Sequence, residues 1–250
     1  MVDIHSHIYP GIDDGSPSME SSLMMLMMAA DSGVTDIVAT PHCNIPDEYD
    51  NYHNEDWVYG FQELQERAAA MHIPIRIHPG QEVYGTDGVV DMLRAGRLIG
   101  INETRRVLIE FSFAEEPIRI YHWLHELLRA GYQPIVAHPE RYPYVQSDLH
   151  LVEDWLYDGC LIQVNKGSIL GRFGEGPCQA AWQLLNRNLV SCVASDAHSY
   201  QFRTTGMTEV YRELCDRLSW EAAEFLLSEN PMRIVRGERA EAVFRPGRGQ

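Results

Sequence analysis

The sequence is poor in positive charge. Its 20 lysine and arginine residues stand against 36 aspartate and glutamate residues, which gives a formal net charge of -16 at pH 7. Binding to a nucleic-acid backbone takes clustered lysine and arginine, so the charge balance argues against a nucleic-acid partner. An anionic substrate would also be repelled by such a protein unless a local positive centre attracted it.

The sequence also lacks a long apolar run. The most apolar stretch, Leu23–Ala30, is far shorter than the roughly 20 residues that a membrane-spanning helix needs. The amino-terminal residues do not show the basic and apolar regions of a secretory signal. We therefore expect a cytoplasmic protein without a membrane span.

Cysteine is scarce and unpatterned. The five cysteines are odd in number, and no two of them form a C-x-x-C pair. This pattern predicts reduced thiols rather than disulfides or a structural zinc site. No cysteine is followed by an arginine six residues later, which is the spacing of the cysteine-dependent phosphatase loop, so a phosphatase of that kind is excluded.

Short apolar, β-branched runs alternate with helix-length segments along the chain, which is typical of a parallel sheet, open or closed. The predicted strands are Val2–Ile8, Asp36–Thr40, Ile75–Gly80, Arg106–Phe111, Pro134–Ala137, Leu161–Val164 and Leu189–Ala194. The predicted helices are Met19–Asp31, Glu55–Met71, Val89–Ala95, Pro117–Ala130, Leu149–Tyr157, Pro177–Asn186, Met207–Leu218 and Trp220–Ser228. The length fits one α/β domain, which we expect to span residues 1–235, with 236–250 as a flexible tail.

Candidate metal ligands fall at or just beyond the carboxyl ends of most predicted strands. His5 and His7 stand two apart in the first strand, and residues i and i+2 of a strand point to the same face. Acids and histidines hold the corresponding positions further along the chain: Asp14, His42, Glu82, Glu110, His138, Asp196 and His198. Active sites of α/β proteins are built at this end of the strands. After the sixth strand, Asn165 and Lys166 offer no strong metal ligand.

These residues resemble the ligand set of the polymerase and histidinol phosphatase (PHP) family, over roughly residues 1–205. His5-Ser-His7, Pro10-Gly-Ile-Asp-Asp-Gly15 and His138-Pro-Glu-Arg-Tyr142 are similar to the manganese-dependent bacterial protein-tyrosine phosphatases of that family, which are linked to capsule and exopolysaccharide synthesis. The resemblance implies a distorted TIM-like (β/α)7 barrel. It also implies that the substrate is a phosphotyrosyl protein, the tyrosine-rich tail of a partner bacterial tyrosine kinase.

The same resemblance implies three divalent metal ions. They would be held in three groups, with Glu82 bridging the first two: His5, His7, Glu82 and Asp196; Glu82, Glu110 and His138; Asp14, His42 and His198. Ligands without thiolate favour Mn or Fe, and Zn, Co and Mg are alternatives. Three such ions contribute +6 against the -4 of the four carboxylates, so the pocket would be positive inside an acidic protein.

The expected reaction is attack by a hydroxide that bridges two metals on the phosphorus of a phosphomonoester. Arg141 and Arg203 match the phosphate-binding arginines of the family, and guanidinium groups bind phosphoryl oxygens bidentately. A phenolate leaving group, with a pKa of about 10, asks little of a general acid, and the sequence identifies none.

Other functions remain open at this stage. One is a small-molecule phosphomonoesterase of the histidinol phosphatase type, and another is a non-catalytic module that only binds a kinase. A metal site that had lost its catalytic function would be expected to lack some ligands, whereas all nine ligand positions are filled here. A homo-oligomer is a further expectation, although Met19-Glu-Ser-Ser22 departs from the arginine-bearing form usual in the family. The polar segment 44–54 is expected to be a loop over the mouth of the site.

Overall fold

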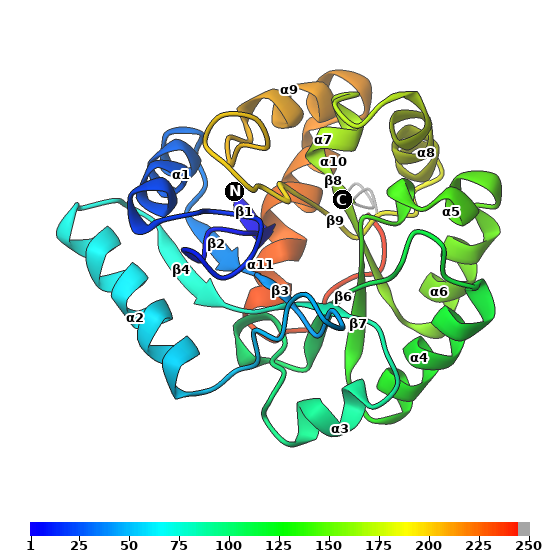
Figure 1. Cartoon of the computed structure of the whole chain (residues 1–250). Coiled ribbons are helices and arrows are strands. Elements are labelled where there is room, and N and C mark those ends of the chain that lie inside the picture. The colour runs from blue at the N-terminus through cyan, green and yellow to red at the C-terminus, as the bar shows by residue number, and fades with distance from the viewer. Residues whose placement is uncertain (245–250) are drawn as a thin grey trace.

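Parallel strands form two sheets, and helices cover their outer faces (Figure 1). The computed structural model describes residues 1–244. One sheet has the order β1-β2-β4 and the other the order β3-β5-β6-β7-β8-β9. The strands are β1 (Val2–Ser6), β2 (Asp36–Ala39), β3 (His42–Cys43), β4 (Arg76–Pro79), β5 (Glu82–Tyr84), β6 (Arg106–Glu110), β7 (Gln133–Ala137), β8 (Leu161–Asn165) and β9 (Cys192–Ala194).

Residues 1–244 therefore contain nine strands where the sequence predicted seven, because two short strands resume beyond the ends of predicted ones. Strand β3 follows β2 after a break at Thr40-Pro41, and β5 follows β4 after a break at Gly80-Gln81. Proline has no amide donor for a ladder, and the neighbouring strand breaks at the same level. The pairing then resumes in the other sheet, with His42 opposite Glu82. The break thus brings an imidazole and a carboxylate side by side.

Hydrogen bonds also connect the two sheets at the outer edge of β1. The His7 amide donates to the Ala197 carbonyl and the Asp196 amide donates to the His5 carbonyl, both at 2.8 Å. Ser6 and Ala197 form one isolated parallel bridge. Within residues 1–244 no ladder joins β1 to β9, so the fold is an α/β domain with parallel sheets rather than a barrel closed by strand pairing.

Residues 1–244 contain more helices than the eight that the sequence predicted. All eight predicted segments are at least partly helical, and α5, α7 and α11 are additional helices that were not predicted. The predicted helix 220–228 is α-helical only to Glu224. The chain then continues as a π-helical turn (η3, Phe225–Glu229) into α11. The helices are α1 (Met19–Asp31), α2 (Glu55–Ala70), α3 (Val89–Arg94), α4 (Pro117–Arg129), α5 (Pro143–Ser147), α6 (His150–Asp158), α7 (Lys166–Ile169), α8 (Glu175–Asn186), α9 (Thr208–Arg217), α10 (Trp220–Glu224) and α11 (Asn230–Val235). Two 3-10 turns are η1 (Ile101–Glu103) and η2 (Pro139–Arg141).

Side-chain oxygens begin two of the long helices. Ser18 accepts a hydrogen bond from the Ser21 amide at the start of α1, and Asn54 accepts one from the Trp57 amide at the start of α2. These caps satisfy amides that have no partner within the helix. No helix among residues 1–244 is long and apolar enough to cross a membrane.

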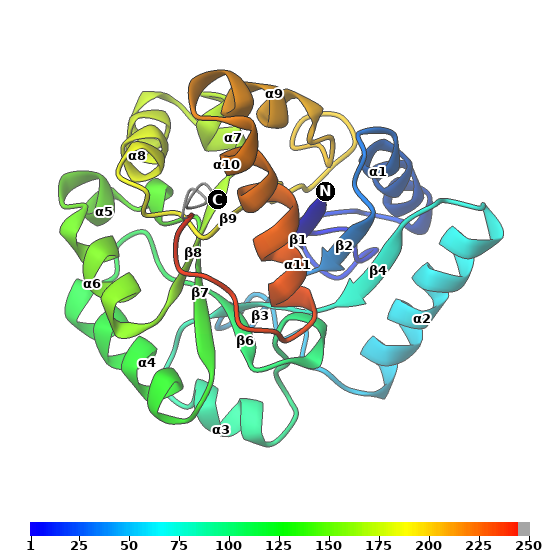
Figure 2. The ribbon, with the colours of Figure 1, turned by 180° about the vertical axis from the view of Figure 1, so that it is seen from behind.

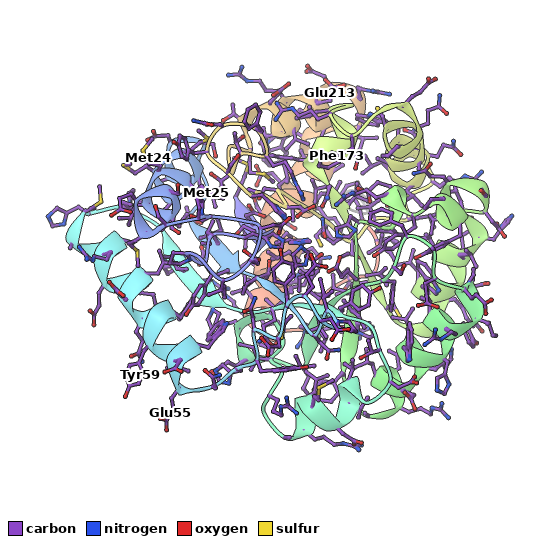
Figure 3. All side chains as sticks on the ribbon, viewed as in Figure 1. Met24, Met25, Glu55, Tyr59, Phe173 and Glu213 are labelled. Atoms are coloured by element: carbon purple, nitrogen blue, oxygen red, sulfur yellow. The ribbon has the colours of Figure 1, made fainter. Side chains whose placement is uncertain are left out.

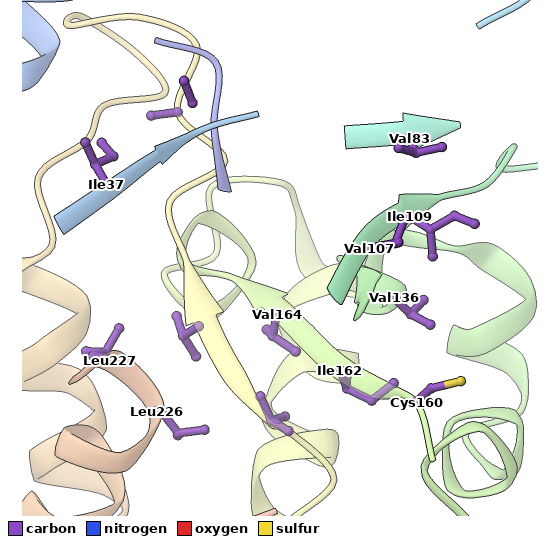
Figure 4. Close-up of a cluster of buried hydrophobic side chains, with 14 of the residues drawn as sticks. Ile37, Val83, Val107, Ile109, Val136, Cys160, Ile162, Val164, Leu226 and Leu227 are labelled. Atoms are coloured by element: carbon purple, nitrogen blue, oxygen red, sulfur yellow. The ribbon is translucent and has the colours of Figure 1, made fainter. Parts of the chain in front are cut away.

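The strands bury both faces. Side chains such as Ile109, Val136 and Ile162 pack against the surrounding helices (Figure 4). The alternate residues point to the opposite face, where a second core cluster includes Leu108, Ile135, Leu161 and, from α11, Ile234 and Val235. Seen from behind, α10 and α11 cross the middle of the molecule (Figure 2). Helix α11 therefore covers the apolar part of this second face.

Toward the carboxyl ends of the strands the second face becomes polar. Glu110 follows Leu108 in β6, and Gln163 and Asn165 follow Leu161 in β8, each at a spacing of two residues. All of these polar side chains are buried. A polar site thus lies above an apolar floor.

Part of the segment expected to form a flexible tail contacts the rest of the chain. The Asn230 side chain donates to the Glu241 carbonyl at 2.8 Å, and Ser191 Oγ donates to the Ala242 carbonyl at 2.6 Å. The Asn188 side chain donates to the Phe244 carbonyl at 2.8 Å. These contacts involve residues 236–244, whereas 245–250 lie outside the described residues.

Candidate metal centre

All nine candidate ligands come together at the carboxyl ends of the strands. Each belongs to at least one group of three or four side chains whose ligand atoms lie within 4.8 Å of one another. The four groups are His7, Asp14, His42 and His198; His5, His7 and Asp196; His5, Glu82 and His138; and His42, Glu82 and Glu110. Four of the residues belong to two groups each, so the groups form one continuous cluster.

Glu82 lies at the centre of this cluster. Its Oε1 is 3.2 Å from His5 Nε2 and 2.8 Å from His138 Nε2. Its Oε2 is 3.2 Å from His7 Nε2 and 3.0 Å from His42 Nδ1. Each oxygen of one buried carboxylate thus contacts two imidazoles. Glu82 could therefore hold a cation with either of its oxygens.

The third predicted group is reached through the loop after β1. Gly15 makes this possible, because a Cβ there would lie 2.3 Å from the His7 Cβ. The loop folds back on His7 and places Asp14 Oδ1 at 3.5 Å from His42 Nε2 and at 3.4 Å from His198 Nε2. His42 also contacts Glu110, at 2.8 Å. His42 therefore links two groups that the sequence placed apart.

Several buried polar atoms in the cluster have no hydrogen-bond partner. They include Glu82 Oε2, Glu110 Oε1 and His42 Nδ1, which form one of the four groups. His42 Nδ1 lies only 2.8 to 3.0 Å from the two oxygens without hydrogen-bond geometry. Buried polar atoms without partners are costly. A shared cation would satisfy all three, so the residues present fit a metal.

The charges of the cluster favour a cation as well. Burial alone would lower the pKa of His42, but the Glu82 carboxylate beside it raises that pKa to about 10. Burial would raise the pKa of Glu82, but the His5 and His42 imidazoles hold it well below its usual range. The pKa of Asp196 is likewise low despite burial, because of His5 and Arg203. The Glu82 and Asp196 carboxylates therefore stay ionised at neutral pH and attract positive charge.

Two of the candidate ligands have a strained backbone. His138 has a φ of 36° and Asp196 a φ of 49°, in the left-handed region that side chains other than glycine rarely adopt. His138 directly follows β7, and Asp196 lies two residues after the end of β9. Strain of this kind persists where the surrounding structure holds it and clusters at functional sites. The bends aim both side chains into the cluster.

A second set of polar side chains holds the candidate ligands. Asp13 Oδ2 accepts a hydrogen bond from His7 Nδ1 at 2.7 Å and from the His42 amide at 3.0 Å. Gln163 Oε1 accepts one from His5 Nδ1 at 2.8 Å. Such partners fix the tautomer and orientation of a metal-binding imidazole. They leave the Nε2 atoms of both histidines free to face the cluster.

Replacing Asp13 with asparagine should weaken metal binding by about 10- to 100-fold, since losing a partner of a metal-binding imidazole typically has that effect. The amide preserves the size of the side chain but not its charge toward His7. The dissociation constant of Mn²⁺, measured by calorimetric titration of the metal-free protein, tests this. Asp31→Asn, at the exposed end of α1, is the control, and equal constants for the two variants would contradict the role of Asp13.

The two predicted phosphate-binding arginines lie on one side of the cluster. Arg141 Nη1 is 3.2 Å and Arg203 Nη2 is 2.5 Å from the same oxygen of Asp196. Arg141 is the last residue of η2, which begins directly after His138. The buried Lys166 holds the loop that carries Arg203. Its Nζ donates hydrogen bonds to the Thr204 carbonyl and, at 2.7 Å, to the Gly206 carbonyl. Both guanidiniums therefore reach the cluster edge from fixed backbone.

The predicted loop 44–54 borders the site. Tyr49 stacks on the His42 ring, with 5.6 Å between centroids and 12° between planes. Asn51 donates hydrogen bonds to the carbonyls of Ile12, at 2.7 Å, and His42, at 2.9 Å. This segment thus packs beside two of the loops that carry candidate ligands.

Sequence analysis missed the residues that hold the candidate ligands. Asp13 was noted only as a carboxylate beside Asp14, without a role of its own. Gln163 was noted only as part of a predicted strand. A signal was present in β8, where Gln163 and Asn165 stand two apart inside a buried strand, as His5 and His7 stand two apart at the end of β1. Polar residues at that spacing share one face.

The chain is thus an α/β protein of parallel strands with a candidate centre for several metal ions at their carboxyl ends. Residues 1–236 match the family described as "Capsular polysaccharide synthesis, CpsB/CapC". The chain belongs to this family.

Curated relatives match along nearly the whole chain. CapC of Staphylococcus aureus is 33% identical over 239 residues, which cover 96% of this chain and 92% of the relative. The tyrosine-protein phosphatase YwqE of Bacillus subtilis is 32% identical over 247 residues, covering 98% and 94%. A solved structure from work on YwqE of Bacillus subtilis and CpsB of Streptococcus pneumoniae, described as unique metal-dependent tyrosine phosphatases, superposes with a TM-score of 0.88 at 31% identity and covers 98% of this chain and 100% of that one.

Proposed function

We propose that this chain is a metal-dependent protein-tyrosine phosphatase. The observation that carries the proposal is the convergence of five imidazoles, four carboxylates and two guanidiniums on one buried centre. The names of relatives that match over more than nine tenths of the chain support it. The resemblance of the sequence points to a bacterial tyrosine kinase of capsule or exopolysaccharide synthesis as the phosphorylated partner.

We propose that three divalent ions occupy the centre and that manganese is the physiological metal. The nine ligands form four overlapping groups, and the shared residues would lie between neighbouring ions. The ligands are nitrogen and oxygen only, a donor set that suits Mn or Fe better than a metal that prefers thiolate. Three ions would outweigh the four carboxylates and make the pocket attractive to an anion.

We also infer that the two sheets act together as one distorted (β/α)7 barrel. The supporting features are the hydrogen bonds between β1 and the chain after β9, and the common level at which two strands divide. If each divided strand counts once, seven strands remain, in agreement with the sequence pattern.

Divalent ions at this centre would turn water into a nucleophile at neutral pH and would polarise the phosphoryl group. The residues of the chain bind and orient the substrate. Arg141 and Arg203 already hold one oxygen of Asp196 between them, and a phosphoryl oxygen offers the same charge to the same donors. A phenolate leaving group, with a pKa of about 10, departs without a strong acid. This chemistry favours a tyrosyl phosphate.

Phosphate release from three substrates tests the proposal. The substrates are a phosphotyrosyl peptide, histidinol phosphate and a phosphodiester, each assayed with chelator-treated protein before and after Mn²⁺ is added. We expect metal-dependent release from the peptide at a kcat/KM at least tenfold above that for the other two. Release from histidinol phosphate at an equal or higher kcat/KM would favour the small-molecule alternative, and no release from any substrate would overturn the proposal.

A further inference from the structure

Phe173 lies on a short loop between α7 and α8 (Figure 3). The loop turns sharply on both sides of it, since Gly171 and Gly174 have φ values of 72° and 95°, a region that favours glycine. The ring rests on the backbone of α7, where a Cβ added at Gly167 would lie 2.6 Å from Phe173 Cε2. Three glycines thus fix where this aromatic side chain sits.

The Phe173 ring contacts both candidate phosphate-binding arginines. The Arg141 guanidinium carbon lies 4.9 Å from the ring centroid, and that of Arg203 lies 5.4 Å from it. Both distances are within the range of a cation–π interaction. Arg141 also lies 5.3 Å from the ring of Phe113. The Arg141 guanidinium therefore contacts two aromatic rings, and one of these rings also contacts the Arg203 guanidinium.

The position of Phe173 also bears on the leaving group. Arg141 and Arg203 converge on Asp196 Oδ2 and would bind the same phosphoryl group. The organic group attached to that phosphorus must leave the pocket past the side chains that border the arginines. Phe173 is half-buried, so part of it remains accessible, and Phe113, the other ring that contacts Arg141, is 47% exposed. An aryl group leaving the pocket meets aromatic surface here.

We propose that Phe173 contacts the aromatic ring of the substrate and positions Arg141 and Arg203, so that the site selects aryl over alkyl phosphomonoesters. This inference rests on the proposed phosphatase function and names a determinant of its specificity. Aromatic pairs prefer stacked or edge-to-face contacts that an alkyl chain does not make. The preference therefore resides in a single ring that contacts both guanidiniums.

Binding of non-hydrolysable ligands tests the inference without turnover. Phenylphosphonate and methylphosphonate are titrated calorimetrically into the manganese-loaded protein and into Phe173→Leu, which keeps apolar bulk but no ring. We expect the preference for phenylphosphonate to fall by roughly three- to tenfold, because an aromatic contact adds about that much to area burial alone. Phe173→Tyr should retain the preference. An unchanged preference in Phe173→Leu would overturn the inference.

Kinetics separate the positioning role from a general effect on the fold. In Phe173→Leu, KM should rise for phenyl phosphate and for an alkyl phosphate, through the displaced arginines, but more for phenyl phosphate, while kcat and the melting temperature change little. Phe202→Ala is the control, since Phe202 adjoins Arg203 in the chain but is 82% exposed. An equal loss of aryl preference in Phe202→Ala would also overturn the inference. If the wild-type protein binds both phosphonates with the expected preference but releases no phosphate, the proposed function fails while the ring's role stands.

Discussion

Replacing Glu82 with glutamine should abolish turnover and remove metal from the protein. Each Glu82 oxygen contacts two imidazoles, at 2.8 to 3.2 Å. The amide keeps the size of the side chain but removes its charge and offers one acceptor instead of two. We expect kcat to fall by about a thousandfold or more, since a metal contributes several kcal/mol of charge stabilisation in the transition state.

Metal content measured by plasma mass spectrometry, together with phosphate release, checks this expectation. Glu140→Gln is a matched control, because Glu140 is also fully buried beside the site but belongs to none of the four ligand groups. Glu140 Oε1 accepts hydrogen bonds from the Asn165 amide at 3.0 Å and the Ser168 hydroxyl at 2.6 Å, and the carbonyl oxygen of glutamine can accept the same two. Equal metal content and activity in the Glu82→Gln and Glu140→Gln variants would contradict a role of Glu82 as a metal ligand.

The sequence was sufficient to predict where the candidate ligands would meet. His5 and His7 share a strand face, and the acids and histidines further along the chain follow other strands at the same end. Parallel strands bring such positions to one edge whatever the loops do. The structure places all nine of these side chains in one cluster. The grouping within the cluster was less predictable, because it depends on how far each loop folds back.

The division of two strands could not be predicted from either strand alone. Pro41 interrupts one ladder, but the matching break at Gly80-Gln81 arises from pairing with that neighbour. Helix α11 escaped prediction for a similar reason. The sequence pattern predicted a helix that ends at Ser228. The chain instead continues through a π-helical turn into α11, which buries Ile234 and Val235 against the strands. Tertiary packing decides such details.

The residues that support the site were hidden by distance in the chain. Gln163 and Asp13 look ordinary until they are placed against His5 and His7. Phe173 stands about 30 residues from each arginine that it contacts, and no local pattern connects them. Geometry rather than spacing identifies these residues.

Alanine at Arg203 or at Arg141 should lower kcat/KM for a phosphotyrosyl peptide by about 10²- to 10³-fold, the usual effect of removing one donor to a transition-state oxyanion. Most of the loss should appear as a higher KM, since each guanidinium also binds the ground-state phosphate. Both contact the same Asp196 oxygen, so the double variant should lose less than the product of the two effects.

Metal content separates this effect from damage to the centre. Neither arginine is a candidate ligand, so both alanine variants should retain wild-type metal content while KM rises. Arg187→Ala, which removes a surface arginine paired with Glu153 at 3.6 Å, should leave KM unchanged. Lysine at Arg203 should recover only part of the affinity, because an ammonium cannot bind two phosphoryl oxygens in one plane. A wild-type KM in both alanine variants would remove the arginines from substrate binding and leave the metal centre as the sole source of affinity for phosphate.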